Sequence, residues 1–237
     1  MPYAVPLTRR EAALRQLREE IVTGQLEPGT LIKDAEVAAR LGISITPVRE
    51  AIAQLAAEGL IDMAPNRTRH VTRVTQKNAL ELIDVMMVLA CAGFEWGVHN
   101  LTSEHLATLR AKLDEFAANL RQGNVTAAAA AGADFSTVVI MASGNRELQT
   151  HVDLVVARTL RVLALTAESR VWTVWLDGYR ESLELLERGD HAGAIERYRQ
   201  IYRDYRARIE NMLFDEPGDD RCPLPPDAER RQADSGP

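Results

Sequence analysis

The stretch LIKDAEVAARLGISITPVREAIAQLAAEGLID, residues 31–62, decides the fold of the first third of the chain. Val37 and Leu41 recur at helical spacing and predict a short helix with one apolar face. Gly42 follows, where a helix end often requires a left-handed residue. A second helix is predicted next, with Pro47 in its first turn, where a missing N–H costs little. The pattern is therefore helix, tight turn, helix.

The second of these helices is predicted to bury one stripe and to expose its start. The buried stripe consists of Val48, Ile52 and Leu55. Ser44 or Thr46 can cap the helix, and Gly59 ends it. Arg49 lies off the apolar stripe, near the first turn. Because the N-terminal end of a recognition helix reaches base edges in the major groove, this exposed start is predicted to face DNA.

A small basic hairpin is predicted after the second helix. Leu60–Met63 reads as one strand, Pro65-Asn66 as a turn, and His70–Val74 as a second strand. Its basic side chains are Arg67, Arg69, His70 and Arg73. No acid occurs between Asp62 and Glu81, so the hairpin suits contact with phosphates or the minor groove. The alternative is a solvated basic turn without a ligand.

An earlier helix completes a compact module. Thr8-x-x-Glu11 is a capping box, and Gly24 stops the helix that it starts. The apolar stripe of this helix is Leu14, Leu17 and Ile21. Residues 1–75 are therefore predicted to form a winged helix-turn-helix DNA-binding domain.

Residues 8–74 also follow a longer pattern of matching positions. In order, they are Ile21-x-x-Gly24-x-Leu26-x-Pro28-Gly29, Leu41-Gly42-Ile43-Ser44-x-Thr46-Pro47-Val48-Arg49-Glu50-Ala51 and Glu58-Gly59-Leu60. This pattern resembles the DNA-binding domain of GntR-family transcriptional regulators. The resemblance implies a homodimer that binds a near-palindromic double-stranded DNA operator, most often as a repressor.

The chain departs from the family pattern at two positions. The family usually has Arg between the Ser and the Thr, often used at a guanine, whereas this chain has Ile45. Isoleucine offers only apolar contact, for instance to a thymine methyl. Near Thr68 the family wing usually carries Gly, so the tip geometry differs. The residues predicted to contact DNA are Ser44, Ile45, Thr46, Arg49, Arg67, Arg69 and His70.

Composition agrees with a two-domain regulator whose DNA contacts are confined to the first domain. Residues 1–74 carry a net charge of +1, and the remainder carries −7 of the total −6. The two cysteines form no metal or redox motif and fit a reduced compartment. The sequence shows neither a signal peptide nor an apolar run judged long enough for a membrane, so a cytoplasmic protein without membrane contact is expected. Residues 215–237 are Pro-rich and charged and are predicted to form a disordered tail.

Residues 76–214 are predicted to be helical throughout, which makes the fold class mostly α. Helices are expected near 76–99, 102–121, 124–142, 145–166, 171–188 and 190–213, as a six-helix antiparallel bundle. Phe135 with Ala142-Ser143-Gly144-Asn145, and Leu186-x-x-Gly189-Asp190-x-x-x-Ala194, carry a second resemblance. Over residues 80–213 the chain resembles the FCD ligand-binding and dimerisation domain of the FadR branch of GntR regulators.

Many FCD domains hold a metal with one Asp and three His. Alignment to that pattern places Gly132 at the Asp, and Ser136, Tyr179 and Ile201 at the three His, with Met86 at a common Arg. All four ligand positions are lost, so no metal or other cofactor is expected. The same five residues are predicted to line a pocket for a small organic effector, either a carboxylate or a more apolar compound, which the hydroxyls of Ser136 and Tyr179 orient. The alternative is that side chains fill the space and no effector exists.

The remaining candidates do not indicate another chemistry. The five histidines show no zinc-like spacing and are predicted to be surface or capping residues; they are His70, His99, His105, His151 and His191. Trp172, Trp175 and Tyr179 share a helical face that is either a core stripe or a pocket wall. No G-x-S-x-G, P-loop, HExxH or CxxC motif occurs, so the chain is not expected to be an enzyme. The alternative to a regulator is a helical small-molecule-binding or interaction protein with a degenerate DNA-binding head.

Overall fold

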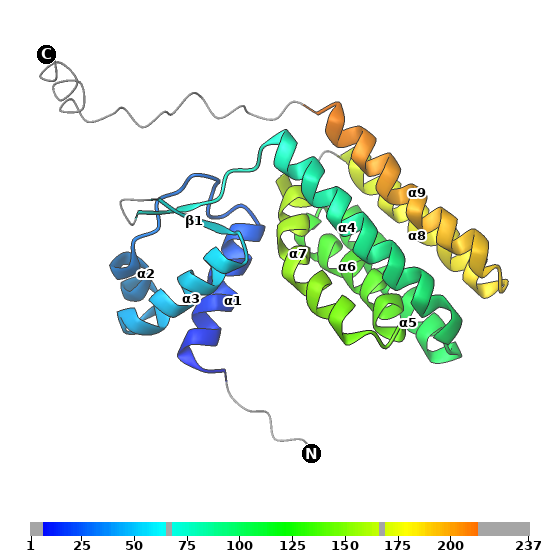
Figure 1. Cartoon of the computed structure of the whole chain (residues 1–237), viewed down its shortest axis with the longest axis horizontal. Helices are drawn as coiled ribbons and strands as arrows, with labels where there is room; N and C mark the ends of the chain where they lie inside the picture. The colour runs from blue at the N-terminus through cyan, green and yellow to red at the C-terminus, as the bar shows by residue number, and fades with distance from the viewer. Residues whose placement is uncertain (1–6, 65–67, 166–168, 213–237) are drawn as a thin grey trace, which may run out of the picture.

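The computed structural model describes residues 7–64, 68–165 and 169–212, which form a small N-terminal head beside a larger helical bundle (Figure 1). The head consists of α1 (Arg9–Val22), α2 (Asp34–Leu41), α3 (Ile45–Ala57), β1 (Ile61–Met63) and β2 (Arg69–Val71). The mostly α fold and the winged helix-turn-helix are confirmed. The predicted turn at residues 65 and 66, Arg67 and the predicted tail lie outside the described residues.

Local sequence signals set the ends of the head helices. The Thr8 side chain accepts from the Glu11 N–H, and the Glu11 carboxylate accepts from the Thr8 N–H at 2.8 Å, so the predicted capping box is present. Gly42 ends α2 with φ of 65°, a left-handed conformation that a side chain would strain. Ser44 occupies the cap position of α3, but its side chain makes no capping hydrogen bond.

The two strands form an antiparallel ribbon in which Ile61 pairs with Val71 and Asp62 with His70. Leu31 forms a further bridge to His70, so the chain before α2 borders the ribbon. Both strands are shorter than predicted, because Leu60 belongs to the turn after α3 and residues 72–74 continue as an extended linker. Buried apolar side chains from all three helices and both strands make one core in the head, including Leu17, Ile52 and Val71.

The bundle follows the linker and contains six helices among the described residues. They are α4 (Gln76–Gly97), α5 (Ser103–Arg121), α6 (Val125–Ala142), α7 (Arg146–Leu165), α8 (Ser169–Glu187) and α9 (His191–Glu210), with a short 3-10 turn η1 (Val98–Asn100) after α4. The predicted ranges differ from these by no more than three residues at either end. The bundle has its own hydrophobic core, which runs from Ala79 to Ile209.

Helix α6 corrects one expectation. It is 18 residues long with mean hydropathy 1.6, so by length and composition it is apolar enough to cross a membrane, contrary to the prediction that no such run exists. In the structure it packs against α4, α5 and α7, and Phe135, Ser136 and Val139 are buried among them. It is thus a core helix of the bundle.

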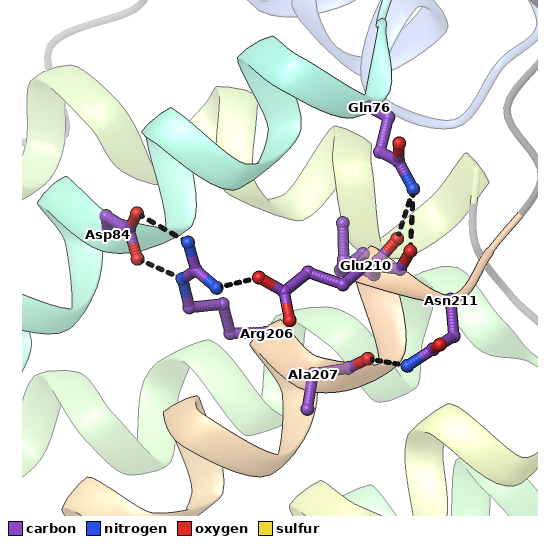
Figure 2. Close-up of polar contacts among 7 residues, drawn as sticks. Gln76, Asp84, Arg206, Ala207, Glu210 and Asn211 are labelled. Carbon is purple, nitrogen blue, oxygen red and sulfur yellow. Dashed lines mark hydrogen bonds and ion pairs between the residues drawn. The ribbon is translucent and has the colours of Figure 1, made fainter.

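Side-chain hydrogen bonds connect α4 and α9, the first and last helices of the bundle (Figure 2). Gln76 Nε2 lies 2.9–3.2 Å from the carbonyl oxygens of Ile209, Glu210 and Met212, and its two N–H groups are shared among these carbonyls at and just after the end of α9. Arg206 Nε donates to Asp84 on α4 at 2.6 Å. The start of α4, where the linker from the head arrives, is therefore fixed to the last turn of α9.

Helix α7 is the part of the bundle that meets the head (Figure 1). It packs against α1, and Ala157 lies against the head core. Arg161 Nη2 donates to the backbone carbonyl of Thr72 in the linker, and Arg158 covers Gly59 at the end of α3. A movement of α7 therefore changes the contacts that position the head.

Candidate nucleic-acid interface and bundle cavity

The start of α3 is exposed, as a helix that enters a groove requires. Ser44, Ile45 and Thr46 are all exposed, and Ile45 keeps 39% of its surface open although it is a large apolar residue. Arg49 lies one turn further and is 64% exposed on its side chain. These four predicted contact residues share one end of the helix, which leaves Val48, Ile52 and Leu55 to the core.

One carboxylate connects the recognition helix to the wing. Arg49 Nε donates to Asp34 Oδ2 at 2.8 Å, and Arg69 Nη1 donates to Asp34 Oδ1. Burial alone would raise the pKa of Asp34, but the hydrogen bonds from Arg49 and Arg69 outweigh it and lower that pKa. Asp34 therefore stays ionised and holds two predicted DNA contacts in a fixed relation. The sequence alone does not reveal this role of Asp34, because an acid in the first turn of a helix is common.

His70 lies in the wing with both ring nitrogens engaged. Nδ1 lies 3.2 Å from the carbonyl of Gly29, and Nε2 lies 3.3 Å from the Thr68 hydroxyl. Because a carbonyl only accepts, Nδ1 carries the proton in this arrangement and Nε2 can accept from Thr68. His70 thus braces the wing, and its contact with DNA stays a prediction that would require one of these bonds to break. Thr68, noted as a departure from the family pattern, supplies one of them.

A cavity inside the bundle gathers most of the predicted pocket residues. It is lined by Met86, Phe116, Ala129, Gly132, Ala133, Ser136, Thr137, Ile140, Val152, Val156, Thr159, Leu160, Leu163, Trp172, Trp175, Tyr179 and Tyr202. We call it the bundle cavity. The space that the centre of a water molecule can reach is about 40 Å³, so the cavity is narrow and its walls are close together.

Ile201 was wrongly placed in this pocket. It is fully buried and packs against α8, where an added Cβ on Gly178 would lie 2.3 Å from Ile201 Cγ1. The neighbouring Tyr202 lines the cavity instead. A shift of one residue turns a helix by about 100°, so Tyr202 and not Ile201 faces the bundle cavity.

Buried hydroxyl groups run along one wall of the bundle cavity. Tyr198 donates to Ser136 Oγ at 2.9 Å, and Ser136 Oγ lies 2.9 Å from the Tyr179 hydroxyl. Burial raises the pKa of Tyr179, Tyr198 and Tyr202 above that of free tyrosine, so all three are neutral donors. Only one proton is used between Ser136 and Tyr179, which leaves the other for an acceptor.

The indole groups in the same wall also lack acceptors. Trp172 and Trp175 are buried, and neither Nε1 has a hydrogen-bond partner among the described residues. The described lining contains no Lys, Arg or His, so no positive charge faces the space. The chemistry of the bundle cavity is therefore apolar, with neutral hydrogen-bond donors in excess. Trp172, Trp175 and Tyr179 are buried core residues, and they also line the bundle cavity.

Two parts of the chain match known families, one in the head and one in the bundle. Residues 9–71 match the bacterial regulatory proteins of the gntR family, and residues 81–204 match the FCD domain. The chain belongs to the GntR family. This GntR protein is a DNA-binding transcriptional regulator, as the head geometry and the predicted resemblance indicated.

Its relatives are regulators too. It is 27% identical over 188 residues to the probable D-xylose utilization operon transcriptional repressor of Paenarthrobacter nicotinovorans, which covers 78% of this chain and 82% of the relative. It is 29% identical over 109 residues to the HTH-type transcriptional regulator McbR of Escherichia coli, over 46% of this chain and 49% of McbR. Both relatives are named for the regulation of transcription.

Solved structures share the whole fold of this GntR protein. The E. coli McbR/YncC structure is similar with a TM-score of 0.75 at 21% identity, covering 87% of this chain and 99% of that one. A putative GntR regulator from Rhodococcus sp. RHA1 is similar with a TM-score of 0.77 at 20% identity, covering 88% and 100%. At these identities the likeness shows the fold of head and bundle together.

The residues at the metal-ligand positions of this FCD domain do not suit an ion. Gly132 has no side chain, and Ser136 and Tyr179 are neutral hydroxyls bonded to each other. Across residues 7–64, 68–165 and 169–212, no group of three or more His, Cys, Asp or Glu could hold a metal. The absence of a metal stays a prediction, tested below.

The structure also joins groups that the sequence left apart. The Nδ1 atoms of His99 and His191 lie 3.2 Å apart at the surface, and the rings meet edge to face. They come from η1 and the start of α9, so spacing along the chain could not reveal the pair. Cys91 is a buried free cysteine, and burial raises the pKa of its thiol to about 11. Neither group borders the bundle cavity or the DNA surface.

We predict that Ile45→Arg changes the operator preference. An arginine at this exposed position can bond guanine O6 and N7, and a bidentate pair contributes about 1–3 kcal/mol of discrimination. Selection from random duplexes should therefore yield half-sites richer in guanine than those of the parent. Ile45→Val, which keeps an apolar surface, is the matched control and should retain the parent motif. If Ile45→Arg selects the parent motif as well, position 45 does not reach the bases.

Proposed function

We propose that this regulator is a cytoplasmic homodimeric repressor that binds a near-palindromic operator and responds to a small neutral effector. The observation that best supports DNA binding is that Asp34 accepts hydrogen bonds from both the exposed Arg49 and Arg69. This shared partner holds the recognition helix and the wing in one orientation. Repression is favoured because a relative that covers most of the chain is named a transcriptional repressor. We further propose residues 1–75 as the DNA-binding domain, 76–214 as the effector domain and 215–237 as a tail.

A second copy of this chain is the proposed occupant of an apolar face of α4. Val85, Val88 and Trp96 are 50%, 65% and 50% exposed, and they recur at helical spacing along one side. Large apolar side chains grouped on a surface indicate an interface. A near-palindromic operator needs two heads related by a two-fold axis, and a dimer through the bundle supplies them.

The effector is proposed to be neutral and mostly apolar, with acceptor oxygens such as a carbonyl or ether. A carboxylate is disfavoured because the described residues that line the bundle cavity include no cation, and an unpaired buried charge is costly. The unpartnered Nε1 atoms of Trp172 and Trp175, and the free hydroxyl proton at Ser136 or Tyr179, call for an acceptor.

Helix α7 connects such an effector to the head. Val152, Val156 and Leu160 on one face line the bundle cavity, whereas Ala157, Arg158 and Arg161 on the other contact the head. Because the cavity is narrow, a ligand that enters has to displace its walls. Displacement of α7 then changes the pose of the head, and operator affinity changes by the effector's differential affinity for the two poses.

The test combines DNA binding with effector response in the full chain. A mobility-shift assay on the DNA upstream of its own gene should give a complex of two chains per duplex, with light scattering confirming a dimer in solution. A thermal-shift screen of neutral carbonyl compounds against carboxylates of equal size should favour the neutral set. The alternative, an interaction protein with a degenerate head, requires no shifted complex at any duplex concentration.

Gly132→Ala tests whether the effector binds in the bundle cavity. Its new Cβ would lie 3.5 Å from Tyr179 Cε2, an ordinary contact, so the bundle should fold while the cavity shrinks. DNA binding without ligand should be unchanged and the effector response reduced. An undiminished response in the folded variant would place the effector elsewhere, whereas failure of the parent protein to bind any duplex would contradict the proposed function itself.

We predict that the protein needs no metal. Elemental analysis of purified protein should show no stoichiometric zinc, nickel or manganese, because glycine and two hydroxyls cannot replace charged or imidazole ligands. EDTA should leave the melting temperature unchanged, since no ion contributes to folding. One tightly held metal per subunit, or a fall in melting temperature with EDTA, would contradict this account of the bundle cavity.

A further inference from the structure

A second cavity lies where the head, the linker and the bundle meet. It is lined by Gly59, Thr72, Arg73, Val74, Asn78, Leu82, Arg158, Arg161 and Val162, and we call it the junction cavity. The water-accessible space is about 100 Å³, which is larger than that of the bundle cavity. It lies on the head-facing side of α7, so the two spaces are separated by that helix.

Unsatisfied donors surround the junction cavity. Arg161 is only 2% exposed; its Nη2 donates to the Thr72 carbonyl, but its Nε has no partner. Arg158 Nε and the Thr72 hydroxyl are likewise buried without a hydrogen-bond partner. Buried polar groups are nearly always paired in folded proteins, so three such groups around one space indicate a missing acceptor.

The charges around the junction cavity also indicate a missing anion. Arg73, Arg158 and Arg161 line it, and no acidic residue is among the described lining residues. Burial lowers the pKa of Arg161 to about 10, and the nearby Asp62 only partly opposes this. A buried guanidinium with so little compensation is costly unless an anion joins it. Arginine forks match the oxygens of carboxylate and phosphate groups especially well.

We propose that the junction cavity binds a small oxyanion, either inorganic phosphate or the carboxylate of a small metabolite. Arg158 and Arg161 on α7 and the Thr72 hydroxyl in the linker would supply the donors. Since these residues belong to the bundle and to the connection with the head, the bound anion joins the two parts. It would hold the head in the pose of this structure and would stabilise the chain in proportion to its concentration over its Kd.

The experiment measures thermal unfolding of the full chain at constant ionic strength, with sodium chloride replaced stepwise by sodium phosphate or sodium acetate. The proposal expects a saturable rise of several degrees in melting temperature with one of the two anions, and the responding anion distinguishes phosphate from carboxylate as the source. Isothermal titration calorimetry with the same salt should give one site per chain.

Arg158→Gln and Thr72→Val test the residues. Arg158→Gln should lower the affinity for the anion at least tenfold, and Thr72→Val, which replaces the hydroxyl with a methyl group, should lower it several-fold. Arg180→Gln is the matched control, because Arg180 pairs with Asp177 on the surface of α8, away from the junction cavity. Circular dichroism confirms that each variant is folded.

Two results would overturn the proposal. One is a melting temperature that responds to phosphate and acetate no more than to chloride. The other is a folded Arg158→Gln protein with the anion affinity of the parent and of Arg180→Gln. Both outcomes are independent of the neutral effector, because neither salt belongs to the ligand class proposed for the bundle cavity.

Discussion

Replacing Arg49 by Ala should weaken operator binding by about 1–3 kcal/mol, a loss of roughly 5- to 150-fold in affinity. Arg49 is exposed in the first turns of α3, and among the described residues its Nε donates to Asp34 while no bond of its other guanidinium nitrogens is seen. A guanidinium has five N–H donors, so its remaining groups are free to meet a base edge or phosphate. Fluorescence anisotropy with the operator and with an unrelated duplex of equal length measures the loss.

Comparison with Arg69 separates the two kinds of contact. Arg69→Ala should weaken all duplexes to a similar degree and flatten the dependence on salt by about one unit of slope, because the wing is expected to meet phosphates. Arg180→Ala on α8 is the control for an exposed arginine that is paired outside the head. Unchanged affinity in both head variants would remove helix and wing from the DNA surface.

The shared carboxylate makes the two variants interdependent. Asp34 accepts from both Arg49 and Arg69, so removal of either leaves the other as its partner. Residues in one hydrogen-bond network are not additive, and the double variant should lose less than the sum of the two single losses. Such non-additive losses would show that Asp34 holds Arg49 and Arg69 as a preorganised pair, whereas additive losses would show that the two arginines bind DNA independently.

Much of the fold could be predicted because it depends on signals close together in the sequence. The capping box at Thr8 and the left-handed glycines at Gly42 and Gly189 fix helix ends within a few residues of themselves. The apolar spacing of three and four then places the core faces. The apolar length of α6 was underestimated, and composition alone does not distinguish a buried helix from a membrane helix.

The functional details that could not be predicted depend on pairs distant in the sequence. Asp34 and Arg69 are 35 positions apart, and Arg161 and Thr72 are 89 apart. The error at Ile201 has the same origin, since the face of α9 that meets the bundle cavity depends on how α9 packs against α8. Sequence spacing fixes which residues share a helix face, but the neighbour of that face is a tertiary property.

Gly97→Ala should cost the most stability of any single methyl group added to the bundle. Gly97 ends α4 where it crosses α6, and an added Cβ would lie 1.9 Å from the backbone carbonyl oxygen of Val139. It would also lie 3.3 Å from the Ser143 N–H group. A backbone cannot move aside as a side chain can, so the two helices must separate, at a cost of about 3 kcal/mol, the upper end for an overpacked core. Urea unfolding followed by circular dichroism measures it.

Gly144→Ala and Gly93→Ala serve as comparisons for the loss of stability at Gly97. Gly144 has φ of 68° and nothing within 4 Å of a new Cβ, so alanine there should cost only the backbone strain of about 1–2 kcal/mol. At Gly93 the Cβ would meet side chains of Ile140 and Leu148 at 3.0 Å, which can shift, so an intermediate loss is expected. Equal losses at Gly97 and Gly144 would contradict the close crossing of α4 and α6. Since Met86 on α4 and Ser136 on α6 line the bundle cavity, that crossing also sets the width available to an effector.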